Sequence, residues 1–331
     1  MSTIADVARV AGVSIATVSR VLSPGAVPHP VRPETAARVR AAARKLNFTP
    51  SPLARGLAVR RSGLVGLVVP DLADPHYPQI AAGVEDAARA ADMGVLICNT
   101  LGDTDRLDEY LQVLEMRRVE AVVISGATSL PPAALLNLGR WGLPLVLIGR
   151  PAGEVRWPHV SIDNVAGGRI ATEHLVTLGC HRIVHLAGPL SQTTMADRAR
   201  GFEETMIGRL GEVIETSGAP EDGYARLRQR LRKVTEVDGV FAATDRLAVA
   251  VLALAADRGL DVPRDLAVVG FDDIPLAPYL RPPLSSILQP AHELGTVAFD
   301  MARRLATGER VAPVVLQPSL VRRRSTVGPA C

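Results

Sequence analysis

The chain has 331 residues, 47% hydrophobic and 21% charged, so it is long enough and apolar enough to form more than one packed core. It contains no apolar run near the roughly 20 residues of a membrane helix, and its first residues lack the order of a secretion signal, so we expect a cytoplasmic protein. Three widely spaced cysteines, Cys98, Cys180 and Cys331, favour reduced thiols over disulfides, and we expect neither a metal nor a cofactor.

Charge is distributed unevenly along the chain. Residues 1–61 hold ten Lys and Arg against two acidic side chains, a balance of +8, whereas the other 270 residues hold 27 basic and 32 acidic side chains, a balance of −5. A basic head on an acidic body is typical of a polyanion-binding module joined to a domain that does not bind nucleic acid.

The first three expected elements are short helices. Apolar residues recur at helical spacing over residues 3–11, Gly12 permits a tight turn, and Ser14 is a suitable N-cap for a second helix, 15–22. A third helix, 33–46, has proline in its first turn. The pattern predicts an all-α helix-turn-helix head.

A short connecting segment follows the head. Residues 47–52 include two prolines and should be extended, and 53–59 are long enough for one or two helical turns that are marginal alone in water. We therefore divide the chain into a DNA-binding head at 1–50, a hinge helix and linker at 51–62, and a third domain at 63–331.

From residue 64 onward, short β-branched runs alternate with amphipathic helices. Such apolar strands are typical of parallel, doubly wound sheets covered by helices on both faces, here in two α/β lobes. The first series of strands is expected at 64–70, 95–99, 121–125 and 145–149, and the second at 160–163, 182–188, 212–215, 239–243 and 266–271.

The chain should cross between the two lobes three times. The crossovers are expected near 150–160, 276–290 and 312–322. Lobe 1 would then comprise 63–150 and 290–312, and lobe 2 would comprise 160–275 and 313–331. Three crossings make a hinge around a cleft, which is the usual place for a small ligand.

Seven motifs follow one another over essentially the whole chain: TIADVARVAGVSIATVSRVL, NFTPSPLARGLAVRRSGLVGLVVPDLADPHY, DNVAGGRIATEHLVTLGCHRI, AGPLSQTTMADRARGF, FAATDRLAVAVL, VVGFDDIPLA and PPLSSILQP. Together they resemble the lactose-repressor (LacI/GalR) family of transcriptional regulators. The resemblance implies a periplasmic-binding-protein-like domain, a homodimer on palindromic double-stranded operator DNA, repression, and a small-molecule effector between the lobes.

The resemblance also assigns DNA contacts. Base contacts fall on Ile15, Ala16 and Arg20, backbone phosphate contacts on Ser14, Thr17 and Ser19, and hinge contacts on Arg55 and Leu57, the last as a wedge between base pairs. An arginine suits guanine, and small apolar side chains suit a thymine methyl. The alternatives are that Ile15 and Ala16 merely fill the helix, that Arg20 contacts a phosphate, and that Leu57 packs on its partner hinge.

For the effector, the matching positions lie at carboxyl ends of strands or at starts of helices. They are His76, Tyr77, Ser125, Arg150, Asp163, Arg198, Asp245 and Asp272. An arginine with aspartates suits vicinal hydroxyls, and Gly218 stands about where some members carry a stacking aromatic, so we expect a sugar or sugar derivative rather than a purine. Asp245 and Asp272 also have structural alternatives: Asp272 with Asp273 could cap the following turn, and Asp245 follows Thr244, which can cap its own helix.

Two other classes of function fit the sequence less well than a regulator does. A sugar-binding transport protein shares the two-lobed fold but needs a signal peptide and no basic head. An enzyme needs a phosphate loop, a nucleophile with its base or a metal site, and none stands at meaningful spacing. We therefore expect a non-enzymatic regulator, nucleoid-associated when bound to operator. The effector either releases or engages the operator, since linkage does not set the direction.

Overall fold

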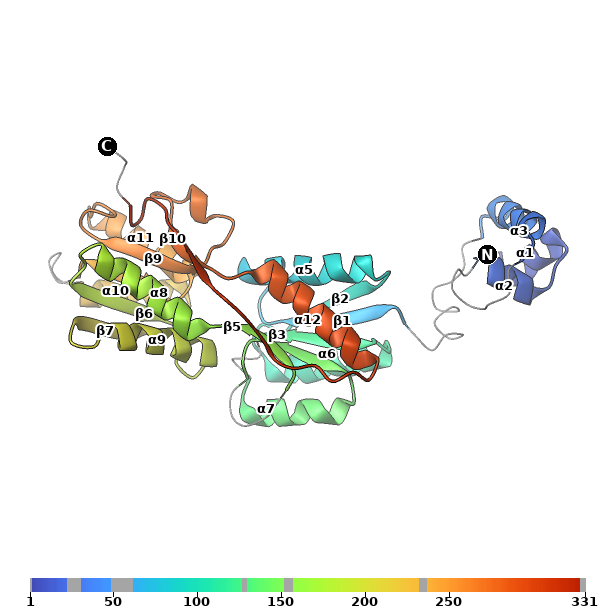
Figure 1. The fold of residues 1–331 in the computed structure, drawn as a ribbon, viewed down its shortest axis with the longest axis horizontal. Coiled ribbons are helices and arrows are strands. Elements are labelled where there is room, and N and C mark those ends of the chain that lie inside the picture. Colours follow the sequence, from blue (N-terminus) through green and yellow to red (C-terminus); the bar gives the residue numbers. More distant parts are fainter. Residues whose placement is uncertain are drawn as a thin grey trace. The chain divides into compact units, whose positions relative to one another are not determined.

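The computed structural model describes residues 2–22, 31–48, 62–126, 130–151, 157–231 and 237–327. The chain divides into two compact units, Met1–Gly63 and Leu64–Cys331, and each folds around its own core (Figure 1). Within the described ranges, no helix combines the length and the apolar character that a membrane span requires.

The first unit is the predicted three-helix head. Its helices are α1 (Ile4–Ala11), α2 (Ile15–Leu22) and α3 (Pro33–Lys45). The Thr3 hydroxyl and the Asp6 carboxylate form a reciprocal capping box at the start of α1, and Gly12 ends it in the left-handed region at φ 62°. Val7, Val18 and Val39 are fully buried, one from each helix, so the apolar spacing seen in the sequence forms the core.

The first lobe of the second unit is a six-stranded parallel sheet in the order β11-β5-β4-β3-β1-β2. Its strands are β1 (Leu64–Val69), β2 (Gly94–Asn99), β3 (Ala121–Ser125), β4 (Leu145–Ile148), β5 (His159–Ile162) and β11 (Val314–Leu316). Its helices are α5 (His76–Ala90), α6 (Thr104–Met116), α7 (Pro132–Asn137) and α12 (Ala291–Ala306), followed after α7 by the 3-10 turn η2 (Leu138–Trp141).

The second lobe repeats this plan in the order β12-β10-β9-β8-β6-β7. Its strands are β6 (Arg182–Ala187), β7 (Leu210–Glu215), β8 (Gly239–Ala242), β9 (Ala267–Asp272), β10 (Ser285–Leu288) and β12 (Ser319–Val321). Its helices are α8 (Asn164–Thr177), α9 (Thr193–Thr205), α10 (Pro220–Arg230) and α11 (Asp245–Asp257), with the 3-10 turn η4 (Ala277–Tyr279) before β10. All its strand pairs are parallel except β12 with β10.

The described residues confirm three crossovers between the sheets: the first lies later in the chain than the sequence predicted, the second falls at the end of its predicted range, and the third lies inside its predicted range. Strand β5 pairs with β4, and β11 pairs with β5, so both belong to the first lobe rather than the second. Strand β10 pairs with β9, which extends the second lobe beyond 275. The chain therefore crosses after β5, between β10 and α12, and between β11 and β12 (Figure 1). The sequence of an apolar strand does not show which sheet the strand joins, because that depends on the strand with which it pairs.

Candidate functional site

Helix α2 presents a mixed polar and apolar face to solvent. Ser14, Ile15, Ala16, Ser19 and Arg20 are exposed, and Thr17 is half-buried. Ile15 leaves 50% of its surface accessible, although the same helix buries Val18 completely. The isoleucine therefore does not serve the core of the head, and its exposure leaves it free to contact a partner.

The start of α2 is organised by hydroxyls. The Ser14 hydroxyl accepts from the backbone N–H of Thr17 at 3.2 Å and lies 2.9 Å from the Thr17 hydroxyl, while Arg20 Nε donates to the carbonyl of Ala16 at 3.3 Å. Such an arrangement of amides and hydroxyls at a helix N-terminus suits phosphate. The predicted hinge contacts, Arg55 and Leu57, lie outside the described residues.

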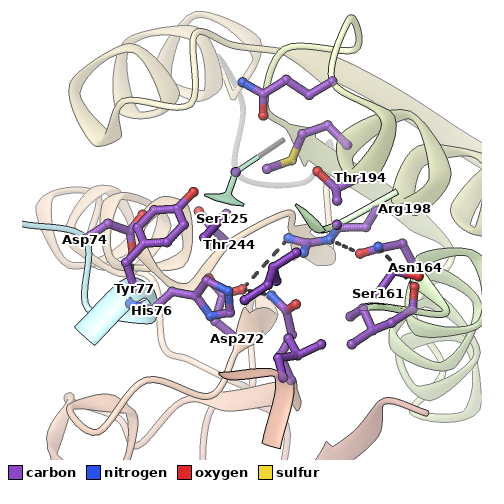
Figure 2. A pocket seen from close by; sticks show the side chains of 18 residues that line it. Asp74, His76, Tyr77, Ser125, Ser161, Asn164, Thr194, Arg198, Thr244 and Asp272 are labelled. Atoms are coloured by element: carbon purple, nitrogen blue, oxygen red, sulfur yellow. Dashed lines mark hydrogen bonds and ion pairs between the residues drawn. The ribbon is translucent and has the colours of Figure 1, made fainter. Parts of the chain in front are cut away.

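A cavity of about 120 Å³, lined by both polar and apolar side chains and partly open to solvent, lies between the two lobes. Figure 2 shows Asp74, His76 and Tyr77 of the first lobe on one side and Arg198 and Asn164 of the second on the other. The lining comprises Asp74, His76, Tyr77, Ser125, Gly126, Ile148, Gly149, Ser161, Ile162, Asn164, Gln192, Thr194, Met195, Arg198, Thr244, Asp272, Gln289 and Leu294. Many of these stand where parallel strands end, as open α/β sheets predict for a ligand site.

Arg198 on α9 is the central cation of the cavity, only 3% exposed. Its Nε donates to Asn164 Oδ1 at 2.9 Å, its Nη1 donates to the carbonyl of Ala243, and its guanidinium stacks on Phe271 with 3.6 Å from Cζ to the ring centroid. These bonds engage two of the five N–H donors of a guanidinium. Burial lowers the Arg198 pKa, which the nearby Asp272 carboxylate opposes.

Asp272 ends β9 and faces Arg198. Its Oδ1 lies 3.9 Å from Arg198 Nη1 and accepts from Gln289 Nε2. Its φ of 114° lies where non-glycine residues are rare, and such strain is found at functional sites. Burial raises the Asp272 pKa, while His76 and Arg198 pull it down. The next residue, Asp273, instead pairs with Arg323 at 2.5 Å, so only one carboxylate of this pair faces the cavity.

The first-lobe wall is built by the loop after β1 and the start of α5. The His76 ring packs edge-on to Tyr77, with 5.5 Å between centroids, and His76 Nδ1 is buried with no hydrogen-bond partner among the described residues. Burial raises the Tyr77 pKa well above its usual range, so the phenol keeps its proton as a donor. Asp74 Oδ1 accepts from the backbone N–H of His76 at 3.0 Å.

The structure brings five of the eight predicted effector residues to the cavity: His76, Tyr77, Ser125, Arg198 and Asp272. Sequence reasoning missed Asp74, Asn164 and Gln289. Asn164 directly follows Asp163 in the motif DNVAGGRIATEHLVTLGCHRI, and Asp74 lies two residues before His76 in the motif that ends in DLADPHY. Both could have been predicted by including the polar neighbours of each matched position. Gln289 is contributed by the end of β10, a strand that the sequence analysis did not anticipate.

The other three predicted residues do not line the cavity. Asp163 caps α8 by accepting from the Ala166 N–H at 2.9 Å. Asp245 is fully buried behind the lining, where it accepts from the Ile274 N–H at 2.8 Å and the Ser286 hydroxyl at 2.6 Å. Burial and the Asp272 charge raise the Asp245 pKa well above its usual value. Asp245 thus follows its structural alternative, and Asp163 caps a helix, a role the sequence analysis did not anticipate for it.

The third, Arg150, belongs to a contact between the lobes at the cavity rim. Its Nη2 lies 2.7 Å from Asp197 Oδ2 on α9, and its carbonyl accepts from the Thr193 hydroxyl at 2.6 Å. A second interlobe pair joins Arg246 on α11 to Asp74, at 3.3 Å. Among the described residues, Arg150 and Arg246 therefore each form ion pairs that bridge the lobes beside the cavity.

Comparison with known proteins identifies a matching family for each of the two units. Residues 3–51 match the model of bacterial regulatory proteins of the lacI family, and residues 172–326 match the periplasmic binding protein-like domain. The ribose operon repressor of Halalkalibacterium halodurans is 36% identical over 300 residues, which cover 90% of this chain and 88% of that protein.

Solved structures agree with the sequence relatives. The lac repressor dimer bound to operator and the anti-inducer ONPF superposes with a TM-score of 0.88 at 27% identity, covering 99% of both chains. A LacI family transcriptional regulator from Enterococcus faecium with bound ribose gives 0.71 at 25% identity, covering 80% of this chain and 98% of that one. On the strength of the full-length relative and the matched head, the chain belongs to the lacI family of bacterial regulatory proteins.

Proposed function

We propose that the protein is a transcriptional repressor that binds palindromic operator DNA as a homodimer and responds to a sugar held between its lobes. One observation carries the proposal: a single chain joins an exposed helix-turn-helix face to a cavity built around the buried Arg198. In this role the protein acts in the cytosol, and on the nucleoid when bound to operator.

Support for the DNA-binding part comes from the head. The basic excess of residues 1–61 supplies the sequence-independent attraction to phosphates, and the exposed Ile15 and Arg20 supply groups that can read base edges. The similar lac repressor structure is a dimer on its operator. We extend the proposal to Ser14, just before α2, to Ala16, Thr17 and Ser19 on α2, and to Arg55 and Leu57 in the hinge.

Support for a sugar comes from the chemistry of the lining. Arg198 and Asp272 supply fixed donors and acceptors, Ser125 lies in the wall, and Tyr77 adds an aromatic face. Position 218 holds a glycine and lies outside the lining, so it offers no aromatic ring that could stack on a nucleobase. The similar Enterococcus faecium structure holds ribose, and the Halalkalibacterium relative is named for the ribose operon.

We propose binding rather than catalysis for this cavity. Across the described residues, no hydrogen bond joins a hydroxyl of the lining to His76 or to a carboxylate, so no activated nucleophile is assembled there. Both carboxylates among the described lining residues are already engaged: Asp272 accepts from Gln289, and Asp74 accepts from the His76 N–H and from Arg246. This arrangement holds a ligand in place without a group poised to attack it.

The test begins with DNA. Rounds of selection from a random duplex pool should enrich a palindromic site, and fluorescence anisotropy then measures affinity for that site with and without ribose and other sugars. We expect at least one sugar to raise the melting temperature and to change operator affinity. The sign of that change identifies an inducer or a co-repressor. A protein that enriches no site would contradict the proposal.

Variants on α2 test which residues read sequence. Arg20→Ala should weaken binding to the selected site about 10- to 100-fold and relax the preference for one base pair, because a bidentate arginine contributes roughly 1–3 kcal/mol of discrimination. Arg9→Ala, also exposed in the head but on α1, is the matched control and should weaken all sequences alike. Equal loss on every sequence for Arg20→Ala would assign it to phosphate.

A further inference from the structure

Carboxylates outnumber cations in the lining of the interlobe cavity. Among the described residues that line it, Asp74 and Asp272 accompany a single guanidinium, that of Arg198. The remaining polar groups are hydroxyls, amides and the His76 ring, and Ile148, Ile162, Met195 and Leu294 form apolar wall. A ligand that brings further negative charge therefore meets two acids and one base.

The charge of Arg198 is already compensated inside the protein. Its guanidinium faces Asp272 at 3.9 Å and stacks on Phe271, and its Nε and Nη1 donate to Asn164 and to the carbonyl of Ala243. A phosphate group at this position would have to share the guanidinium with the Asp272 carboxylate. A hydroxyl can accept from the same guanidinium without that repulsion.

Three helices that begin at the cavity have a carboxylate at their N-terminus. Asp74 accepts from the first N–H of α5 at 3.0 Å, Asp163 caps α8 at 2.9 Å, and Asp245 lies in the first turn of α11. The positive ends of these helices would otherwise favour an anion. The fourth, α9, begins with the neutral Gln192 and Thr194 in the lining.

The two arginines at the rim are also paired. Arg150 contacts Asp197 at 2.7 Å, and Arg246 contacts Asp74 at 3.3 Å and Asp71 at 3.9 Å. Asp74 is thus the one lining carboxylate that holds a rim arginine, so its removal would both delete a negative charge and release a positive one beside the cavity.

We propose that the cavity selects an uncharged sugar and rejects the phosphate ester of the same sugar, and that Asp74 is the residue that sets this discrimination. The inference rests on the proposed function and narrows its ligand class. An uncharged polyol matches the lining, since each hydroxyl can donate to a carboxylate or to the unpartnered His76 Nδ1 and accept from Arg198 or Tyr77.

Calorimetry on the full-length protein with matched ligand pairs tests this inference. The pairs are D-ribose with D-ribose 5-phosphate and D-glucose with D-glucose 6-phosphate, and the measured quantity is the ratio of dissociation constants within a pair. In any pair that binds, we expect the uncharged sugar to bind at least about 100-fold more tightly, as for a negative charge brought beside two carboxylates and one shared guanidinium. An ester that binds as well as its parent sugar overturns the inference and leaves a sugar-responsive repressor standing. Binding by neither member of either pair, with operator binding intact, overturns the proposed sugar effector and this inference with it.

Two variants move the ratio in opposite directions. Asp74→Asn should reduce the ratio of the ester's dissociation constant to the sugar's at least about 10-fold. Arg246→Ala, which leaves the Asp74 carboxylate without its cation, should increase that ratio. Asp108→Asn is the matched control, because Asp108 makes a similar ion pair with Arg140, at 2.9 Å, and lies outside the lining. Operator binding by each variant reports that it folds. An unchanged ratio in both Asp74→Asn and Arg246→Ala removes Asp74 from the discrimination.

Discussion

The two lobes use the same packing device for different chemistry. In the first lobe, α5 packs on α12, and a side chain at Gly83 would collide with the carbonyl oxygen of His292; in the second, α8 packs on α9, and a side chain at Gly168 would collide with the carbonyl oxygen of Arg198. Each glycine lets two helix backbones approach closely. In the second lobe the approach also fixes the residue that carries the cavity's cation.

The faces that these helices turn to the ligand differ accordingly. The first lobe contributes Tyr77, His76 and Leu294, whereas the second contributes Arg198 and Asn164 above the ring of Phe271. A buried, multiply bonded arginine can discriminate strongly, because its partners are fixed before the ligand arrives. We therefore expect the second lobe to supply most of the affinity.

The largest expected effect is the loss of the second-lobe cation. Arg198→Ala should weaken sugar binding at least about 100-fold, because hydrogen bonds to a charged group contribute roughly 1.5–3 kcal/mol each. Calorimetry with the sugar identified by thermal shift measures the dissociation constants of the wild type and the variant. Arg209→Ala, an exposed arginine of the same lobe, is the control. Retention of the dissociation constant within about threefold by Arg198→Ala would place the affinity elsewhere.

The second effect concerns the close approach of α8 and α9. Gly168→Ala should lower the free energy of unfolding by about 1–3 kcal/mol, since the new methyl group has no space beside the Arg198 carbonyl. Gly139→Ala is the control, because its Cβ would come no closer than 3.9 Å to the Trp157 ring. Urea titrations of the two variants compare them directly, and equal stability would show that the α8–α9 contact relaxes at little cost.

A third prediction concerns a histidine in the second lobe at a strand position where the first lobe has a leucine. His185 of β6 pairs with Phe241 of β8 at the register position where Leu67 of β1 pairs with Val123 of β3. Burial lowers the His185 pKa to about 3, and the ring is fully buried between Phe202 and Phe241. Because the folded state holds the ring neutral, stability is present above pH 6.5 and falls as acid protonates the unfolded chain.

His185→Leu, which installs the residue of the first lobe, should remove this acid sensitivity. Between pH 7 and pH 5 the unfolding free energy of the wild type should fall relative to that of the variant by roughly 2 kcal/mol, at about 1.4 kcal/mol per pH unit below pH 6.5. Chemical denaturation at several pH values measures it, with the exposed His181→Leu as the control. Identical pH slopes for the wild type and His185→Leu would exclude His185 as the source.

The smallest effect is expected at the rim. Arg150→Ala removes the interlobe pair with Asp197 but leaves the buried second-lobe contacts in place. Because partly exposed ion pairs contribute about 0.2–1 kcal/mol, the dissociation constant of the neutral sugar should change less than about fivefold. Calorimetry at low and high salt tests it, and the difference should shrink as salt increases. A loss as large as that of Arg198→Ala would make the rim, rather than the second lobe, the main determinant.

Periodicity in the sequence was sufficient for the fold but not for the whole site. The apolar runs of β1, β3, β8 and β9 are nearly continuous, so they predict parallel buried strands without ambiguity. Which sheet β5 joins depends on the hydrogen bonds of its edges, and no local pattern encodes that choice.

The site residues divide in the same way. Asp272 was found because a motif and a strand end coincide, and Arg198 was found from its motif, inside α9. Arg150 also follows a strand but turns toward Asp197 on α9 rather than into the cavity. Asp74 was missed because it stands in a loop where an aspartate is common for local reasons, and its role emerges only when Arg246, 172 residues away, lies beside it.

The crossings between lobes also bear on the order in which the protein can be completed during synthesis. The first lobe needs α12 and the edge strand β11, both of which follow the whole of α8 to β10 in the chain. A ribosome must therefore translate almost all of the second lobe before the first can close its sheet. The nascent first lobe carries an unpaired edge at β5 for most of that time, exposed to neighbouring chains or to chaperones.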